Sequence, residues 1–172
     1  MSMQVIFSHG KESGPWGTKI MALAEVAKDL GCQVDSVDYR TDLDVEQRVS
    51  RLKNVLQQQS GQPIYLVGSS MGGYVATVAA GSTDCAGLFL MAPAFYLGGY
   101  ADIDELPLKC PVDIVHGWQD DIVPVANSWR FALGYRANLH VLNDDHRLVD
   151  TLPQTTELFK QSLTRVITNL SG

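Results

Sequence analysis

The sequence has few cysteines, no excess of positive charge and no long hydrophobic run. Its three cysteines, Cys32, Cys85 and Cys110, are widely spaced and form no C-x-x-C pair, so we interpret them as buried thiols rather than metal or redox residues. No stretch approaches the roughly 18 to 20 apolar residues of a membrane span. The opening residues MSMQVIFSHG contain no basic leader and no small-residue cleavage site. We therefore predict a cytoplasmic protein without a membrane partner.

The charge balance is acidic. The 13 Lys and Arg residues are outnumbered by 19 Asp and Glu residues, which gives a formal net charge of −6. Nucleic acid and anionic membrane surfaces repel such a chain, so neither is expected as a partner. The length of 172 residues and the absence of repeats and low-complexity tracts predict one domain over residues 1–172.

Short β-branched runs alternate with longer segments in which apolar residues have helical spacing. The expected strands are Gln4–Ser8, Gln33–Asp38, Ile64–Gly68, Gly87–Ala92, Val112–His116 and Asn138–Leu142. This alternation is typical of parallel strands joined by crossover helices. It predicts an α/β fold with a doubly wound, mainly parallel six-stranded sheet and helices on both faces.

Three helices are placed by their start and stop signals. The first is expected to begin at Pro15 or Trp16 and to stop at Gly31. The second has Asp44 as its N-cap and ends before Gly61. The last begins at about Pro153, and its buried stripe is expected to contain Leu158, Phe159, Leu163, Val166, Ile167 and Leu170.

The stretch LVGSSMGGYVA places Ser70 between Gly68 and Gly72, in a G-x-S-x-G pattern. It follows an apolar strand and opens a helix, which is the setting of a nucleophile elbow. The alternative is an ordinary glycine-rich turn. We predict that Ser70 is a nucleophile.

A serine hydroxyl needs a base to act as a nucleophile at neutral pH. His146 lies in the polar loop NDDHRL after the last strand, at the carboxyl side of the sheet where active sites of open parallel sheets gather. We predict that His146 is the base. The other three histidines, His9, His116 and His140, are given structural roles.

The base in turn needs an acid that orients it, and the segment HGWQDDIVP offers Asp120 and Asp121. We favour Asp120 and interpret Asp121 as a solvated or helix-capping carboxylate. The chain order is then Ser, Asp, His.

The segments FSHGKESGP, GSSMGG, HGWQDDIVP and DDHRL occur in this order along the chain. Together they resemble a small member of the α/β-hydrolase superfamily. The resemblance implies an oxyanion hole made by the backbone N–H groups of Met71, which follows the nucleophile, and Lys11, which follows His-Gly. These two donors converge only if the first strand lies beside the third, which predicts the strand order 2-1-3-4-5-6.

The segment PAFYLGGYADIDELPLKCP occupies the place where relatives insert a helical cap, so we expect a minimal hydrolase fold with a short flap and an open site. Phe95, Tyr96 and Tyr100 on this flap, together with Trp118, are candidates to line an acyl pocket. The alternative for these aromatic residues is packing in the core.

These features predict a serine hydrolase that cleaves small or medium acyl esters through an acyl-enzyme, with no metal and no cofactor. A thioesterase acting on an acylated thiol or partner protein is an alternative, and so is a binding module without turnover. A metal-assisted hydrolase using His9, His116, Asp120 and His146 is disfavoured because these ligands lack compact spacing.

Overall fold

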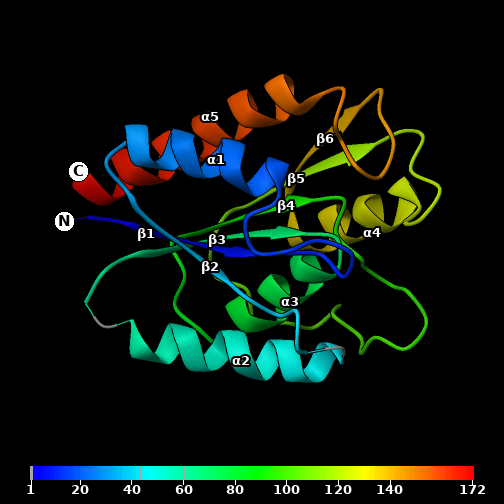
Figure 1. Cartoon of the computed structure of the whole chain (residues 1–172), viewed down its shortest axis with the longest axis horizontal. Helices are drawn as coiled ribbons and strands as arrows, with labels where there is room; N and C mark the ends of the chain where they lie inside the picture. Colours follow the sequence, from blue (N-terminus) through cyan, green and yellow to red (C-terminus); the bar gives the residue numbers. More distant parts are fainter. Residues whose placement is uncertain (1, 43, 60) are drawn as a thin grey trace.

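The computed structural model describes residues 2–42, 44–59 and 61–172 and contains a six-stranded, entirely parallel sheet (Figure 1). The strands are β1 (Gln4–Ser8), β2 (Gln33–Val37), β3 (Ile64–Ser69), β4 (Gly87–Met91), β5 (Val112–Gly117) and β6 (Asn138–Leu142). The helices are α1 (Thr18–Asp29), α2 (Val45–Gln58), α3 (Met71–Ala80), α4 (Val125–Tyr135) and α5 (Leu152–Ser171). The order β2-β1-β3-β4-β5-β6 confirms the predicted topology.

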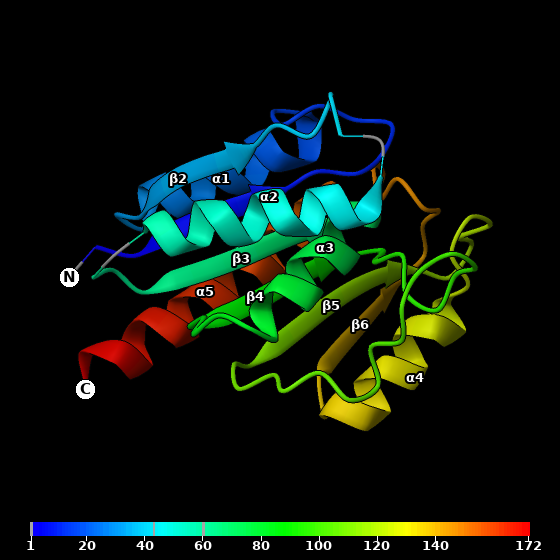
Figure 2. The ribbon, with the colours of Figure 1, turned by 90° about the horizontal axis from the view of Figure 1, so that it is seen from below.

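Helices cover both faces of the sheet. Figure 1 shows α1 and α5 on one face and α2 and α3 on the other, and Figure 2 shows α4 beside β5 and β6. Side chains of β1 alternate between the two faces: Phe7 packs in the core under α1 and α5, whereas Ile6 packs in the core under α2 and α3. None of the helices within the described residues is long and apolar enough to cross a membrane.

The predicted strands agree with the structure to within one residue at each end, but the start of α1 is wrong. Pro15 and Trp16 precede the helix, which begins at Thr18 after Gly17 as N-cap. The carbonyl of Pro15 accepts a hydrogen bond from the Ser36 hydroxyl, and this contact to the end of β2 holds the loop away from helical geometry.

The second helix begins as predicted, because the Asp44 side chain accepts hydrogen bonds from the backbone N–H groups of Glu46 (2.7 Å) and Gln47 (3.2 Å). In α5, Phe159, Leu163 and Val166 are buried as expected. The prediction for Leu170 is wrong: it is 54% exposed. Leu170 lies in the last turn of α5, where it lines a cavity together with Met3 and Pro63, so its side chain is not covered by close packing.

The connection from β4 to β5 contains no helix and no strand, and no cap domain stands over the sheet in the described part of the chain. This flap, residues 92–111, is fastened to α4. The Asn127 side-chain amide donates to the Phe95 carbonyl (2.7 Å), and the Leu106 N–H donates to the Tyr135 hydroxyl (2.7 Å).

A buried polar network joins α5 to the sheet. The Ser162 hydroxyl donates to the Asp113 carboxylate on β5 (2.7 Å), and Arg165 donates to the same oxygen (2.6 Å). The single Ser162 proton is thereby used, so the Tyr65 hydroxyl of β3 is the donor in its 2.6 Å contact with Ser162. The network sets how α5 lies across β3 and β5.

Replacing Asp113 with alanine leaves a buried hydroxyl and a guanidinium without their acceptor. We expect the free energy of unfolding to fall by roughly 2–4 kcal/mol. Tyr65→Phe removes one hydrogen bond and is expected to cost about 1 kcal/mol. Urea denaturation measures both, with the exposed Asp84→Ala as the control. If Asp113→Ala lowers the free energy of unfolding no more than the control does, the network contributes nothing to stability.

Candidate active site

Ser70 stands in a strained turn between β3 and α3. Its φ of 54° and ψ of −121° lie in a region that residues other than glycine seldom adopt. A Cβ at Gly68 would lie 2.5 Å from the Gly72 carbonyl oxygen, and a Cβ at Gly72 would overlap the carbonyl oxygen of Ser8. The two glycines therefore allow β3, α3 and β1 to approach closely enough to form the turn.

The side chains of Ser70, His146 and Asp120 form a continuous chain of hydrogen bonds. His146 Nε2 lies 3.0 Å from Ser70 Oγ, and His146 Nδ1 lies 2.7 Å from Asp120 Oδ2. A carboxylate accepts hydrogen bonds, so Nδ1 carries the proton and Nε2 is free to accept the serine proton. The three residues come from the turns after β3, β5 and β6, at the carboxyl edge of the sheet.

Asp120 and Asp121 are clearly distinguished by their surroundings. The Asp120 side chain is fully buried, whereas Asp121 is exposed. Asp120 Oδ1 also accepts hydrogen bonds from the backbone N–H groups of Ile122 (2.9 Å) and Val123 (2.8 Å). Of the two aspartates, Asp120 is the one that contacts His146.

His116, which we expected from the sequence to have only a structural role, contacts Asp120. Its Nε2 lies 2.9 Å from Asp120 Oδ2 and 2.9 Å from the Val123 carbonyl, and its Nδ1 lies 2.8 Å from Ser128 Oγ. Both partners of Nε2 are acceptors, so His116 donates to Asp120. Its position four residues before Asp120, at the end of a strand, is the sequence signal that could have identified it.

The hydrogen bonds keep Asp120 ionised. Burial alone would raise the pKa of this carboxyl group, but hydrogen bonds from His116, His146 and the backbone N–H groups of Val123 and Ile122 outweigh it and hold the pKa well below its usual value. At neutral pH an ionised carboxylate therefore lies beside His146.

The two predicted oxyanion donors lie next to Ser70. Met71 opens α3, and Lys11 follows the turn at the end of β1, which pairs with β3. A Cβ added at Gly10 would lie 3.4 Å from the Ser70 Cβ, so this turn packs against the elbow. Among the described residues, neither the Met71 nor the Lys11 backbone N–H has a protein acceptor.

The prediction that Phe95 lines an acyl pocket does not agree with its position. Phe95 is fully buried and stacks on Phe131 of α4, with 4.4 Å between ring centroids. Its side chain packs in the core because the backbone of the flap folds inward at this point, where the Ala94 N–H donates to the Ser70 carbonyl (3.0 Å).

The other three aromatic candidates have different surroundings. The Tyr96 ring lies under the Arg130 guanidinium, 3.8 Å from ring centroid to Cζ, and its hydroxyl donates to Asp104 (2.5 Å). Tyr100 packs against Tyr74, with 4.7 Å between ring centroids. Trp118, on the loop that carries Asp120, is 64% exposed. Trp118 is thus the candidate with a large free apolar surface.

Of the four residues of the metal-assisted alternative, His116, Asp120 and His146 are joined by hydrogen bonds, whereas His9 contacts none of them. Both ring nitrogens of His9 contact backbone groups: Nδ1 lies 2.8 Å from the Gly10 carbonyl and Nε2 lies 2.9 Å from the Tyr39 N–H nitrogen. Within the described ranges, no group of three or more His, Cys, Asp or Glu side chains is arranged to hold a metal ion.

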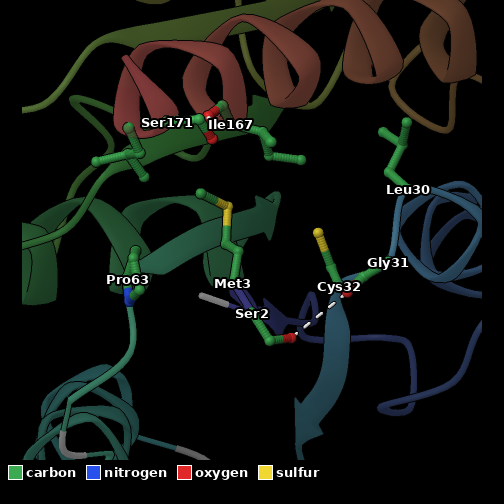
Figure 3. Close-up of a pocket in the computed structure, with 9 residues that line it drawn as sticks. Ser2, Met3, Leu30, Gly31, Cys32, Pro63, Ile167 and Ser171 are labelled. Atoms are coloured by element: carbon green, nitrogen blue, oxygen red, sulfur yellow. Dashed lines mark hydrogen bonds between the residues drawn. The ribbon is translucent and has the colours of Figure 1, made fainter.

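Two cavities lie away from Ser70. Figure 3 shows one of about 380 Å³ where β1 and β2 begin, opposite the edge that carries Ser70; Met3, Cys32 and Ile167 are among its lining residues. The other, of about 550 Å³, is an open hollow on the outer side of α2. Neither is lined by Ser70, His146 or Asp120.

Comparison with known proteins agrees with the fold. The model of the Uncharacterised protein family (UPF0227) matches residues 4–105. None of the curated protein sequences matches significantly. Est1E from Butyrivibrio proteoclasticus has the same fold, with a TM-score of 0.84 and 20% identity over 97% of this chain and 88% of that one. An esterase from Pyrococcus furiosus gives a TM-score of 0.81 with 17% identity, over 98% of this chain and 82% of the other.

A protein from Xanthomonas campestris pv. campestris, assigned to the α/β superfamily of hydrolases, is more similar in sequence. It is 33% identical, with a TM-score of 0.87, and the match covers 96% of this chain and 99% of the other. These similarities support a hydrolase. The chain belongs to the UPF0227 family and, with it, to the α/β-hydrolase superfamily.

Proposed function

We propose that the protein is a serine hydrolase that cleaves carboxylic esters of small or medium acyl groups. The observation that carries the proposal is the hydrogen-bonded chain from Ser70 through His146 to Asp120, with distances of 3.0 and 2.7 Å. Its geometry satisfies the two requirements of an activated serine, which are a base in contact with the hydroxyl and an acid that orients the base.

In the proposed first half-reaction, Ser70 Oγ attacks the ester carbonyl carbon and its proton passes to Nε2 of His146. The tetrahedral intermediate collapses, the alcohol leaves with that proton, and the acyl group remains esterified to Ser70. Asp120 stabilises the imidazolium while it exists. The N–H groups of Met71 and Lys11 donate to the negatively charged oxygen of the intermediate.

In the second half-reaction, a water molecule attacks the acyl carbonyl and gives a proton to His146. The acid is released as Ser70 Oγ takes that proton back. Every proton is returned, so the cycle consumes one ester and one water and yields one acid and one alcohol.

The surroundings of Ser70 favour substrates that do not need a deep pocket. The flap of residues 92–111 is a loop fastened to α4, and no cap stands over the described site. Trp118 offers an exposed apolar surface on the loop that carries Asp120. Est1E has been crystallised with ferulic acid, which makes aromatic acyl esters a reasonable first panel here. Thioesters undergo the same acyl transfer and belong in that panel.

The proposal predicts that a fluorophosphonate labels Ser70. The Ser70 oxygen should displace fluoride from phosphorus, and intact mass should increase by one adduct per chain. Ser70→Ala should give no adduct. Absence of label on folded wild-type protein would contradict the proposal and favour a binding module without turnover.

The assignment of the acid predicts different effects at two adjacent aspartates. Asp120→Asn should fold and lose roughly 10⁴-fold in kcat, because the amide favours the wrong imidazole tautomer. Asp121→Asn, at an exposed position, should keep the wild-type kcat. Steady-state kinetics on an activated ester, together with thermal melting, measures both. The opposite ranking would move the role to Asp121.

A further inference from the structure

Arg48 is a charged side chain buried in the molecule. It is 2% exposed and belongs to the first turns of α2, which begins near the edge where β1 and β3 end (Figure 2). Within the described part of the chain, it forms no ion pair with a carboxylate. Burying an unpaired charge costs free energy, so its hydrogen-bond partners are of interest.

Within the described residues, the hydrogen-bond acceptors of the Arg48 guanidinium are all backbone carbonyls. Nε donates to Asp42 (2.9 Å), while Nη1 donates to His9 and to Gly10, both at 3.3 Å. The guanidinium also lies over the Tyr39 ring, 5.1 Å from its centroid. Burial lowers the pKa of Arg48, yet a guanidinium stays protonated at physiological pH. A positive charge is therefore directed at the turn that follows β1.

The Gly10 carbonyl has a second donor, the His9 side chain. The Tyr39 N–H donates to His9 Nε2 (2.9 Å), so this nitrogen is unprotonated and Nδ1 carries the proton. Nδ1 then donates to the Gly10 carbonyl (2.8 Å). Burial lowers the pKa of His9, which favours this neutral form.

These contacts determine the direction of the next N–H. The peptide that joins Gly10 to Lys11 is trans, and a trans peptide is planar with its C=O and N–H pointing in opposite directions. A carbonyl held by Arg48 and His9 therefore directs the Lys11 N–H away from both. Hydrogen bonds to the carbonyl also polarise the peptide and make its N–H a better donor.

We propose that Arg48, together with His9, is a positioning residue that orients and polarises the Gly10–Lys11 peptide so that the Lys11 N–H can donate to the oxyanion. This inference rests on the proposed function, because it concerns the transition state of the same acyl transfer. Arg48 does not touch the substrate and acts only through the backbone.

An ester and the thionoester with the same acyl and alcohol groups separate this role from a merely structural one. In the thionoester, sulfur replaces the carbonyl oxygen, and it is a larger and weaker acceptor that gains little from N–H donors placed for oxygen. Loss of a well-placed donor should therefore slow the ester more than the thionoester. A general disturbance of the fold should slow both equally.

The expected result for Arg48→Met is a decrease in kcat on the ester of roughly tenfold to a hundredfold with little change in KM, because a displaced catalytic group costs up to about that much. The ratio of ester to thionoester kcat should fall. Arg48→Lys retains the charge and should recover part of the ester kcat and part of the ester-to-thionoester ratio. The matched control is Arg51→Met, on the same helix, which removes a contact to the Asp42 side chain but none to Gly10. It should behave as wild type.

Equal losses on both substrates, or wild-type rates in folded Arg48→Met, would overturn the inference and leave the proposed function intact. If Arg48→Met does not fold, Arg48→Lys and His9→Gln are subjected to the same ratio test, and an unchanged ratio in both overturns it. Wild-type protein that neither hydrolyses the esters nor reacts with a fluorophosphonate would instead overturn the proposed function, and the inference would fall with it.

Discussion

The arrangement at the carboxyl edge of the sheet depends on the close approach of β3, α3 and β1 at Gly72. A Cβ at this position would overlap the Ser8 carbonyl oxygen, so the approach requires glycine. The tight turn that results holds Ser70 at a positive φ and places its hydroxyl above the edge of the sheet. It also brings the turn after β1 against the elbow. The nucleophile candidate and both candidate oxyanion donors are thus positioned by one packing contact.

Two groups of buried polar contacts converge on this elbow from opposite sides. From β5 and β6, His116 and His146 both donate to Asp120, which keeps the carboxylate charged in a buried place. Arg48 of α2 and the neutral His9, which follows β1, donate to the Gly10 carbonyl. In each case, residues that do not touch the substrate hold a group next to the reacting atoms: His116 holds Asp120, and Arg48 with His9 holds the Gly10–Lys11 peptide. Preorganised dipoles of this kind are effective because they need no rearrangement when charge develops on the substrate.

Much of the fold follows from local signals. Alternation of apolar strands and amphipathic segments predicted all six strands, and the superfamily resemblance predicted their order. Asp44 was recognisable as a cap because its partners, the backbone N–H groups of Glu46 and Gln47, lie only two and three residues further along the chain. Ser70, Asp120 and His146, chosen from loop position and chain order, lie in one hydrogen-bonded chain. The helix start at Thr18 and the exposure of Leu170 were not predicted, and the sequence left open whether Phe95 lines a pocket or packs in the core, where it lies.

The sequence by itself determined the periodicity of each element, the strained serine turn and the polar loops at the strand ends, because these features depend on residues close together in the chain. Only the tertiary structure decided which buried polar groups meet. Arg48 and Gly10 are 38 positions apart, and Tyr39 and His9 are 30 apart. Hydrophobic spacing indicates that a side chain is buried but carries no information on the direction of its hydrogen bonds. Those directions arise when α2 packs beside the end of β1, which is a property of the topology and of no single segment.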